Sequence, residues 1–368
     1  MRSHRFLTAV FIILPIVVAV LFTSVLVVLV GNQPGEVFQT VLEGAFRNSN
    51  AVAAVVNFWI PLVMVSMGLI VTFTAGLWNI GVEGQMMMGA IFASWAAQFL
   101  SLPQPLQIVV EVAMAALGGA LWAGLTGVLK TKLGVNEIFG GVGLNALANL
   151  LAIYLITGPW QPPEGGSAHA TPPFPENSLL PPMSAEFPVS LLALVLAFAS
   201  IVGVTMALRG TKWGLQLKAT GKSPRSALLM GVPTTRSAVT ALMLCGLLAG
   251  IAGSYRVLFT YESLRPLVSG GIGFLGLLVV LLAGIRALWT PFIAFIFAAI
   301  LAGSTRLRVS LQLDASLAGV LQGMLVLLVL LSNGLRQRVL EWSDSRTAAT
   351  TPTPPASPAT GADGGQNG

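Results

Sequence analysis

Ten long stretches of this sequence carry no charged side chain, and no other feature constrains the fold as strongly. Each stretch is largely apolar and at least 18 residues long, and about 20 helical residues are enough to cross a ~30 Å hydrocarbon core. The stretches are residues 6–35, 48–82, 84–110, 112–129, 138–163, 187–208, 237–255, 266–285, 287–305 and 315–335. The pattern predicts about 10 transmembrane helices, with a range of 8–10.

The composition excludes a soluble globular protein. Hydrophobic residues make up 55% of the chain and charged residues 9%, and the mean hydropathy is +0.84. Soluble domains average roughly 45–50% apolar and about 25% charged residues. Only helices and closed barrels satisfy every backbone group in lipid, and these stretches lack the alternation of barrel strands. The predicted fold class is therefore an all-α, polytopic integral membrane helix bundle.

The distribution of basic residues predicts the orientation. Arg2 and Arg5 precede a first apolar stretch that is too long for a cleaved signal peptide. If ten spans alternate from a cytoplasmic N-terminus, 14 of the 19 Lys and Arg residues lie on the cytoplasmic side. The positive-inside rule then places both termini in the cytoplasm. Arg306 and Arg308 lie outside in this arrangement, so whether 287–305 is a full span stays open.

Two segments differ in kind from the rest of the predicted transmembrane domain, residues 1–342. The outer loop 158–187 is rich in proline and carries no Lys or Arg, as expected of a translocated connection. The loop 209–236 is basic and is predicted to be cytoplasmic. Residues 343–368 hold mainly Ser, Thr, Pro, Ala and Gly, too little apolar surface to offset the entropy of ordering, so this tail is predicted to be disordered.

Several chemistries are disfavoured by what the sequence lacks. The net charge of +6 comes from basic residues in short loops, whereas nucleic-acid binding needs them on one soluble face. His4 and His169 are far apart and have no zinc-ligand spacing, and Cys245 is the single cysteine. We therefore expect no metal, no cofactor and no catalytic activity in this chain, and no nucleic-acid partner.

The segment 219–223 ends like a phosphate-binding loop, but the resemblance is superficial. That motif needs a glycine at the position where this chain has Gln216, and no apolar strand leads into the segment. Any ATP hydrolysis must then come from another chain.

The same region predicts a short cytoplasmic helix over residues 224–230. Ser223 is a good N-cap, Pro224 suits the first helical position, and Gly231 followed by Pro233 is a stop signal. Two turns of helix are too short to be stable alone. The helix either rests on its own bundle or is a rigid peg that seats in a partner protein.

Polar residues interrupt the apolar pattern between the second and third stretches. Asn79, Glu83 and Gln85 lie there among glycines that permit a helix break. Polar groups at membrane depth are costly, so a functional role is one interpretation, and a solvated inner turn is the other. In such a turn Glu83 could accept hydrogen bonds from the free N–H groups of residues 85–89.

Uncharged polar side chains also occur inside the apolar stretches. They would suit a pathway for a neutral polar solute, although each can equally serve as a hydrogen bond between packed helices. The candidates are Asn57, Ser66, Thr72, Thr74, Asn145 and Asn149.

Two pairs of glycines four residues apart predict close helix packing. The pairs are Gly246 with Gly250 and Gly319 with Gly323. Small residues at this spacing share one helix face and let neighbouring backbones approach.

The segment 75–78 followed by NIGVEGQMMMGA, residues 79–90, closely resembles a family signature. The family is the permease subunits of bacterial ATP-binding-cassette importers for nucleosides and simple sugars, related to ribose and branched-chain amino acid permeases. Similar segments recur in the family's order over most of residues 36–335, namely 135–137, 143–145, 157–159, 163–166 and 218–232. This sequence departs from the family's pattern in the low polarity of 270–282 and in Arg225 and Leu228-Leu229.

The resemblance implies a permease subunit without catalytic activity, located in the bacterial plasma (inner) membrane. It implies four kinds of partner: membrane lipid, a second permease subunit of the same or a sister type, ATP-binding subunits that hold ATP-Mg, and an extracytoplasmic solute-binding protein. The implied ATPase-coupling residues are Gly221, Ser223, Pro224, Arg225, Ala227, Leu228 and Gly231. The pathway or substrate candidates are Asn57, Asn79, Glu83, Gln85, Asn145 and Asn149.

An ion-coupled secondary transporter of a small polar solute is the alternative. That mechanism usually needs ionisable groups buried in mid-span. In this sequence only Glu83 and Glu111 are isolated between apolar runs. A membrane-embedded enzyme would need acids, histidines or metal ligands that converge at one depth, and the sequence offers no such set.

Overall fold

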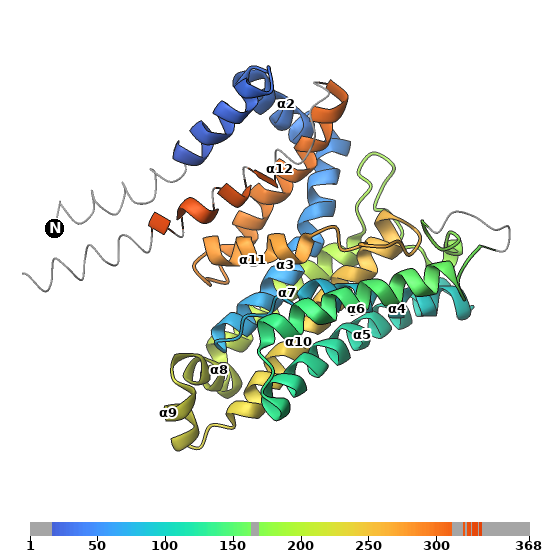
Figure 1. Ribbon diagram of the computed structural model, residues 1–368. Coiled ribbons are helices and arrows are strands. Elements are labelled where there is room, and N and C mark those ends of the chain that lie inside the picture. The colour runs from blue at the N-terminus through green and yellow to red at the C-terminus, as the bar shows by residue number, and fades with distance from the viewer. Residues whose placement is uncertain are drawn as a thin grey trace, which may run out of the picture.

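The computed structural model describes residues 17–162 and 169–310, together with 319–332 except 321, 325 and 330. Regular structure in these residues is entirely helical, which confirms the predicted class (Figure 1). After a helix at Val17–Leu29, the elements are α2 Pro34–Phe46, α3 Ser49–Thr74, α4 Val82–Phe99, α5 Gln104–Leu133, α6 Glu137–Thr157, η1 Glu176–Ser178, α7 Leu191–Gly210, α8 Lys212–Lys222, α9 Pro224–Leu229, α10 Thr234–Tyr255, the π-helical turn η2 Arg256–Thr260, α11 Ile272–Leu282 and α12 Thr290–Ser310. The predicted disordered tail 343–368 lies outside the described residues.

The described helices make the chain a multi-pass membrane protein. Six of them are long and apolar enough to cross a membrane: α3, α5, α6, α7, α10 with its π-helical extension, and α12. Val17–Leu29 and α2 would add a seventh as one span bent by 108°. The predicted count of about 10 is therefore not confirmed in this part of the chain. The difference arises from α4 and α11, which are shorter or less apolar than a full span, and from stretch 315–335, which lies partly outside the described residues.

One predicted boundary is wrong. Glu111 was taken to separate two spans, but α5 runs unbroken past it from Gln104 to Leu133 and buries its side chain completely. The Gln107 amide donates to the Glu111 carboxylate at 2.7 Å, so this charged residue is held inside the helix packing. The chain turns instead just before Pro103, where it leaves α4 and enters α5.

A central group of helices forms the core. Helix α3 is buried around most of its circumference, as expected of a helix that is apolar on all sides. Helices α4, α5 and α10 pack together so closely that a Cβ added at Gly250 would overlap the backbone of Ala115. The predicted packing role of Gly246 and Gly250 is confirmed. At Gly319 and Gly323 the described residues place no atom within 4 Å of an added Cβ, so the predicted packing is not found there.

The loop that precedes α7 is fixed in part against the segment that follows α10. Backbone hydrogen bonds join Thr171 N to Leu264 O at 3.0 Å and Phe174 N to Glu262 O at 2.9 Å. Segment 171–180 is therefore packed beside η2, whereas residues 181–186 are exposed.

Candidate functional site

The connection between α3 and α4 passes through the interior of the bundle. Gly76 adopts a left-handed conformation, with φ of +76°, and turns the chain back after α3. The Asn79 side chain then reaches Cys245 in the middle of α10, with 3.1 Å between Nδ2 and Sγ. Asn79 is fully buried and Glu83 is only 8% exposed. The predicted helix break is confirmed, and the alternative of a solvated turn is wrong.

Two amides lock this connection to the start of α4. Asn79 Nδ2 donates to Gln85 Oε1 at 3.0 Å, and Gln85 Nε2 donates back to Asn79 Oδ1 at 2.9 Å. Asn145 of α6 adds a second pair of bonds, from its Nδ2 to Ile80 O at 2.9 Å and from Gly84 N to its Oδ1 at 2.7 Å. Buried polar groups need such partners. These amides therefore fix the backbone of the broken segment.

Glu83 caps a different helix from the one predicted. Its carboxylate accepts a hydrogen bond from Phe274 N at 3.1 Å, in the first turn of α11, and not from the N–H groups of α4. The Ser269 side chain and the backbone at Gly271 and Gly273 lie near the same carboxylate. A Cβ at Gly273 would lie 2.8 Å from Glu83 Oε1, so only glycine permits this approach. Glu83 thus joins the start of α4 to the start of α11.

The other two predicted pathway residues lie elsewhere. Asn149 accepts from Leu267 N at 3.0 Å and so holds the segment that leads into α11. Asn57 donates to Pro188 O at 2.9 Å and accepts from the Tyr255 hydroxyl at 2.7 Å. The structure therefore gathers Asn79, Glu83, Gln85 and Asn145 around the start of α4, with Asn149 one turn along α6, and places Asn57 apart from them.

Arg256 is a buried residue, although the predicted alternation of ten spans places it in an outer loop. It starts the π-helical turn after α10 and is only 4% exposed. Its Nη2 donates to the Tyr261 hydroxyl at 2.6 Å and its Nε to Val268 O at 3.3 Å, and its guanidinium lies 5.7 Å from the Phe58 ring centroid. The run of apolar and aromatic residues after Arg256 was the signal for burial. Arg256 and Asn149 together hold the segment 261–271.

Segment 261–271 is conformationally strained. Glu262 and Leu267 both have φ of 53°, in the left-handed region that β-carbons disfavour. Two glycines with positive φ, Gly270 and Gly271, complete the turn into α11. Such strain persists only where surrounding contacts hold it.

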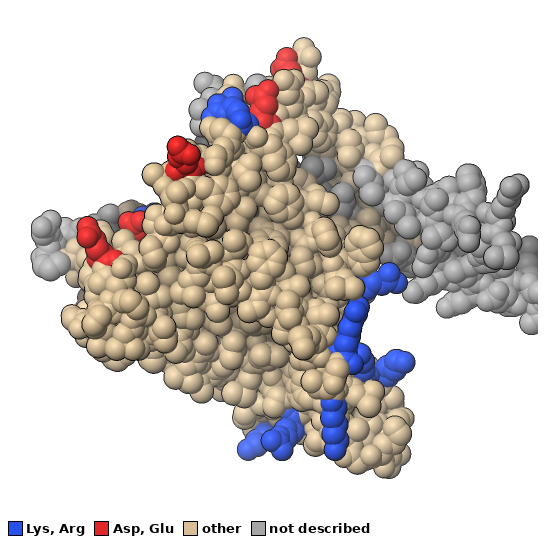
Figure 2. Space-filling view, turned by 180° about the vertical axis from the view of Figure 1, so that it is seen from behind, with Lys and Arg blue, Asp and Glu red and all other residues tan. Residues whose placement is uncertain are grey.

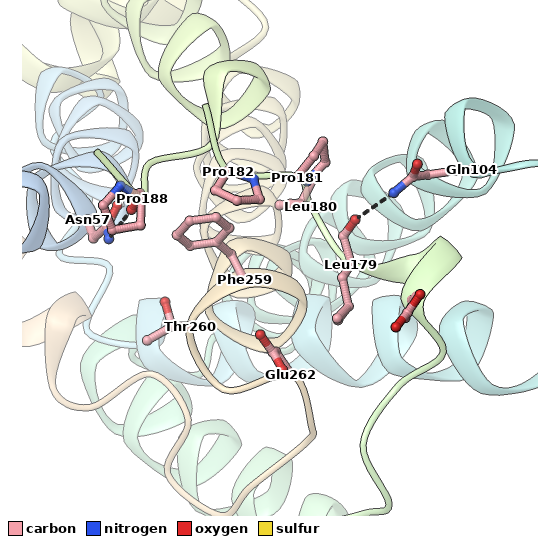
Figure 3. A pocket seen from close by; sticks show the side chains of 11 residues that line it. Asn57, Gln104, Leu179, Leu180, Pro181, Pro182, Pro188, Phe259, Thr260 and Glu262 are labelled. Carbon is pink, nitrogen blue, oxygen red and sulfur yellow. Dashed lines mark hydrogen bonds between the residues drawn. The ribbon is translucent and has the colours of Figure 1, made fainter. Parts of the chain in front are cut away.

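A cavity of about 550 Å³ lies between η2 and the loop that precedes α7 (Figure 3). Figure 3 shows the Phe259 ring beside Pro182, with Asn57 on one side and Gln104 on the other. Phe259 stacks on Tyr255 with ring centroids 5.1 Å apart. The full lining is Asn57, Gln104, Glu176, Leu179, Leu180, Pro181, Pro182, Pro188, Phe259, Thr260 and Glu262, which includes two carboxylates and no Lys or Arg.

The predicted short helix is present as α9, Pro224–Leu229. Ser223 caps it by accepting from Ser226 N, and Gly231 ends it with φ of +79°. Only Ala227 packs against the rest of the chain, whereas the adjoining apolar side chains are exposed. The exposed fractions are 62% for Leu228, 89% for Leu229 and 74% for Met230.

The sequence reasoning missed α8, the helix that carries α9. Gly221 and Lys222 form its last turn, so this stretch is helical and not a phosphate-binding loop. Helix α8 packs on α7 and α10, which holds α9 at one end of the bundle (Figure 1).

Among the described residues no three His, Cys, Asp or Glu side chains converge to hold a metal ion.

Comparison with known proteins places these features in a family. The family model for the permease component of branched-chain amino acid transport systems matches residues 51–330. No solved structure matches the chain significantly.

Curated relatives carry related names. The chain is 27% identical to the glucose ABC transporter permease protein TsgB13 of Haloferax volcanii over 74% of both chains. It is 24% identical to the guanosine ABC transporter permease protein NupP of Bacillus subtilis, over 81% of this chain and 86% of the relative. The nucleoside ABC transporter permease protein NupB of Lactococcus lactis is 25% identical, with coverages of 79% and 82%. Because the family model matches most of the chain, this protein belongs to that family and is a permease subunit of an ATP-binding-cassette transporter, whose ATPase is a separate subunit.

Proposed function

We propose that this permease forms half of an import pathway for a neutral nucleoside or simple sugar. A second permease subunit, of the same or a sister type, supplies the other half. A separate ATP-binding subunit holds ATP-Mg and drives transport, and an extracytoplasmic binding protein delivers the solute. The names of the relatives support this class of solute and system.

The observation that carries the proposal is the unpartnered apolar face of α9. A six-residue helix has little stability of its own, yet its cap and stop residues fix it rigidly. Leu228, Leu229 and Met230 project away from the bundle beside the exposed Arg225. Adjacent exposed apolar side chains mark interaction sites. The ATP-binding subunit is the partner that covers them.

This part of the proposal is tested by purification. Affinity-tagged permease, co-expressed with its ATP-binding subunit, should yield a complex that hydrolyses ATP in lipid nanodiscs. A permease that purifies alone under all conditions, with no ATP-binding subunit retained, contradicts the assignment of α9.

The chemistry of the outer cavity supports a neutral solute. Its volume falls within the range of small-molecule sites, roughly 300–1,000 Å³. Glu176 and Glu262 offer acceptors for hydroxyl groups, and Phe259 offers a ring face for a sugar or a base. Two carboxylates without a lining cation repel a phosphorylated solute. We propose that the cavity receives the solute at the outer mouth of the pathway.

Phe259→Ala is expected to lower the initial rate of solute uptake about tenfold, since loss of a ring contact worth roughly 1.4 kcal/mol corresponds to that factor. Uptake of labelled uridine or glucose by cells with equal permease levels measures the effect. Phe99→Ala is the matched control, because Phe99 is 58% exposed and does not line the cavity. Equal uptake by the Phe259 variant and the control would place the solute elsewhere.

We also propose that both termini and α8–α9 are cytoplasmic, in a bundle of about 10 spans. Figure 2 supports this orientation, because Lys and Arg gather at one end of the visible face and most Asp and Glu at the other. Basic side chains on the cytoplasmic side are the general rule for membrane proteins. The proposed location is the plasma (inner) membrane of a bacterium.

Reporter fusions test the orientation. A reporter inserted after Lys218 in α8, and one fused at Gly368, are both expected to report cytoplasm. A reporter inserted after Ala185, in the exposed outer loop, is expected to report the outside. A cytoplasmic signal from Ala185 would reverse the orientation of the segments that flank it.

A further inference from the structure

The end of α8 and the end of α3 touch backbone to backbone. A Cβ added at Gly221 would overlap the carbonyl oxygen of Thr74 and lie 3.0 Å from Gly76 N. From the other side, a Cβ at Gly76 would lie 3.1 Å from Gly221 Cα. Gly221 is two residues before Ser223, the cap of α9. The rigid helix α9 is thus linked to the end of α3 by a contact that has no room for a side chain.

Gly76 opens the connection that leads to Glu83. Asn79 and Gln85 brace this connection internally, and Asn145 fixes its backbone to α6. Glu83 then contacts the first turn of α11. A displacement at Gly76 therefore reaches α11 along the backbone of the connection and then through the buried Glu83 side chain.

The surroundings of the contact leave room for movement. A cavity of about 270 Å³ lies beside it, bounded by Ala75, Thr131 of α5, Thr220, Pro224 and Thr234 of α10. Gly76 and Gly221 are exposed, so this space is open to the surface. It leaves α8 and α9 room to shift relative to α5 and α10.

We propose that the Gly221–Gly76 contact passes movement of α9 to the α3–α4 connection and, through Glu83, to α11. The inference rests on the proposed function, because the ATP-binding subunit supplies the movement. Gly221 and Gly76 are positioning residues. They bind no solute, but their contact links α8 and α9 to α3 and to the α3–α4 connection. Coupling of this kind needs an element with two arrangements that both sites bias. The α3–α4 connection with α11 is that element.

Gly221→Ala tests the proposal in the complete complex with both permease subunits, the ATP-binding subunits and the binding protein in proteoliposomes. The measured quantity is the amount of solute imported per ATP hydrolysed. We expect this ratio to fall about tenfold while the complex assembles and ATP hydrolysis stays within about twofold of wild type. A residue with only a structural role would change assembly and leave this ratio unchanged. Gly210→Ala is the control, since no atom lies within 4 Å of its added Cβ.

A second variant approaches the contact from α3. Gly76→Ala introduces a milder clash but also strains a residue with φ of +76°. Gly134→Ala controls for the strain, because Gly134 has φ of +68° and no atom within 4 Å of its added Cβ. Uncoupled hydrolysis in Gly76→Ala, with normal coupling in Gly134→Ala, supports the proposal.

The possible results distinguish failure of this coupling route from failure of the proposed transport function. A wild-type complex that imports solute without ATP defeats the proposed function itself. With ATP-driven import in the wild type, an unchanged ratio in either contact variant overturns the inference alone. If both contact variants fail to assemble while both controls assemble, the contact is structural and the inference is likewise overturned.

Discussion

Leu228→Asp is expected to abolish retention of the ATP-binding subunit and all ATP-driven uptake, while the permease still inserts at its normal level. Leu228 is 62% exposed on α9, so an aspartate there leaves the chain's own packing intact. In the complex the aspartate carboxylate would be buried in an apolar surface of the ATP-binding subunit. Burying a carboxylate that has no hydrogen-bond or charge partner costs several kcal/mol. At 1.4 kcal/mol for each factor of ten, affinity for the ATP-binding subunit should fall at least about 100-fold.

Quantitative pull-down of the ATP-binding subunit from detergent-solubilised membranes measures the Leu228 effect. Leu133→Asp is the matched control, because Leu133 is similarly exposed, at 69%, and lies at the end of α5 rather than on α9. We expect the control to retain the subunit. A Leu228→Asp complex that assembles and transports at the wild-type rate would remove α9 from the interface.

Glu83→Gln is expected to lower uptake by at least about tenfold without preventing insertion or binding of the ATP-binding subunit. The carboxylate accepts from Phe274 N in the first turn of α11. An amide of equal size keeps one acceptor oxygen, replaces the other with an NH2 donor and removes the negative charge that a helix N-terminus favours. Hydrogen bonds to charged groups contribute about 1.5–3 kcal/mol each, and that loss would loosen α4 from α11.

Uptake rates at matched expression, together with the thermal midpoint of the purified permease, measure the Glu83 effect. Glu186→Gln removes an exposed carboxylate from the outer loop and is the control. We expect both the uptake rate and the midpoint to fall for Glu83→Gln and neither to change for the control. Normal uptake by Glu83→Gln would reduce Glu83 to a packing residue outside the transport cycle.

Local signals explain what the sequence could predict. Ser223, Pro224 and Gly231 act within a few residues of one another, and the helix they predict is α9. The glycines around Asn79 and Glu83 likewise indicate the break between α3 and α4. Among the polar residues inside apolar stretches, Asn79 and Asn145 form hydrogen bonds that hold the connection between these helices.

What the sequence could not predict depends on distant contacts. The partner of Glu83 is Phe274, 191 residues further along the chain, and no periodicity links the two. The burial of Arg256 depends on Phe58, which lies on another helix. The sequence predicts a boundary at Glu111 because a charge normally ends a span. In the structure Gln107, one turn away on α5, donates a hydrogen bond to Glu111 and holds it inside the helix packing.

Glu111 bears on the alternative of an ion-coupled carrier. It is fully buried, and its Oε2 has no hydrogen-bond partner among the described residues. Its other oxygen accepts from Gln107, which also donates to Ala96 O at 3.0 Å and accepts from Leu102 N. This network lies where α4 turns into α5, so one oxygen of Glu111 belongs to the hydrogen bonds that hold this turn.

The energy source of transport tests the central claim most directly. Proteoliposomes that contain the permease pair and the ATP-binding subunit, with ATP enclosed on the side of α9 and loaded binding protein on the other, measure uptake of labelled nucleoside or sugar. The account predicts uptake that requires ATP, stops with vanadate and is unaffected when proton and sodium gradients are collapsed. Uptake by the permease alone, driven by an imposed ion gradient and indifferent to ATP, would contradict it.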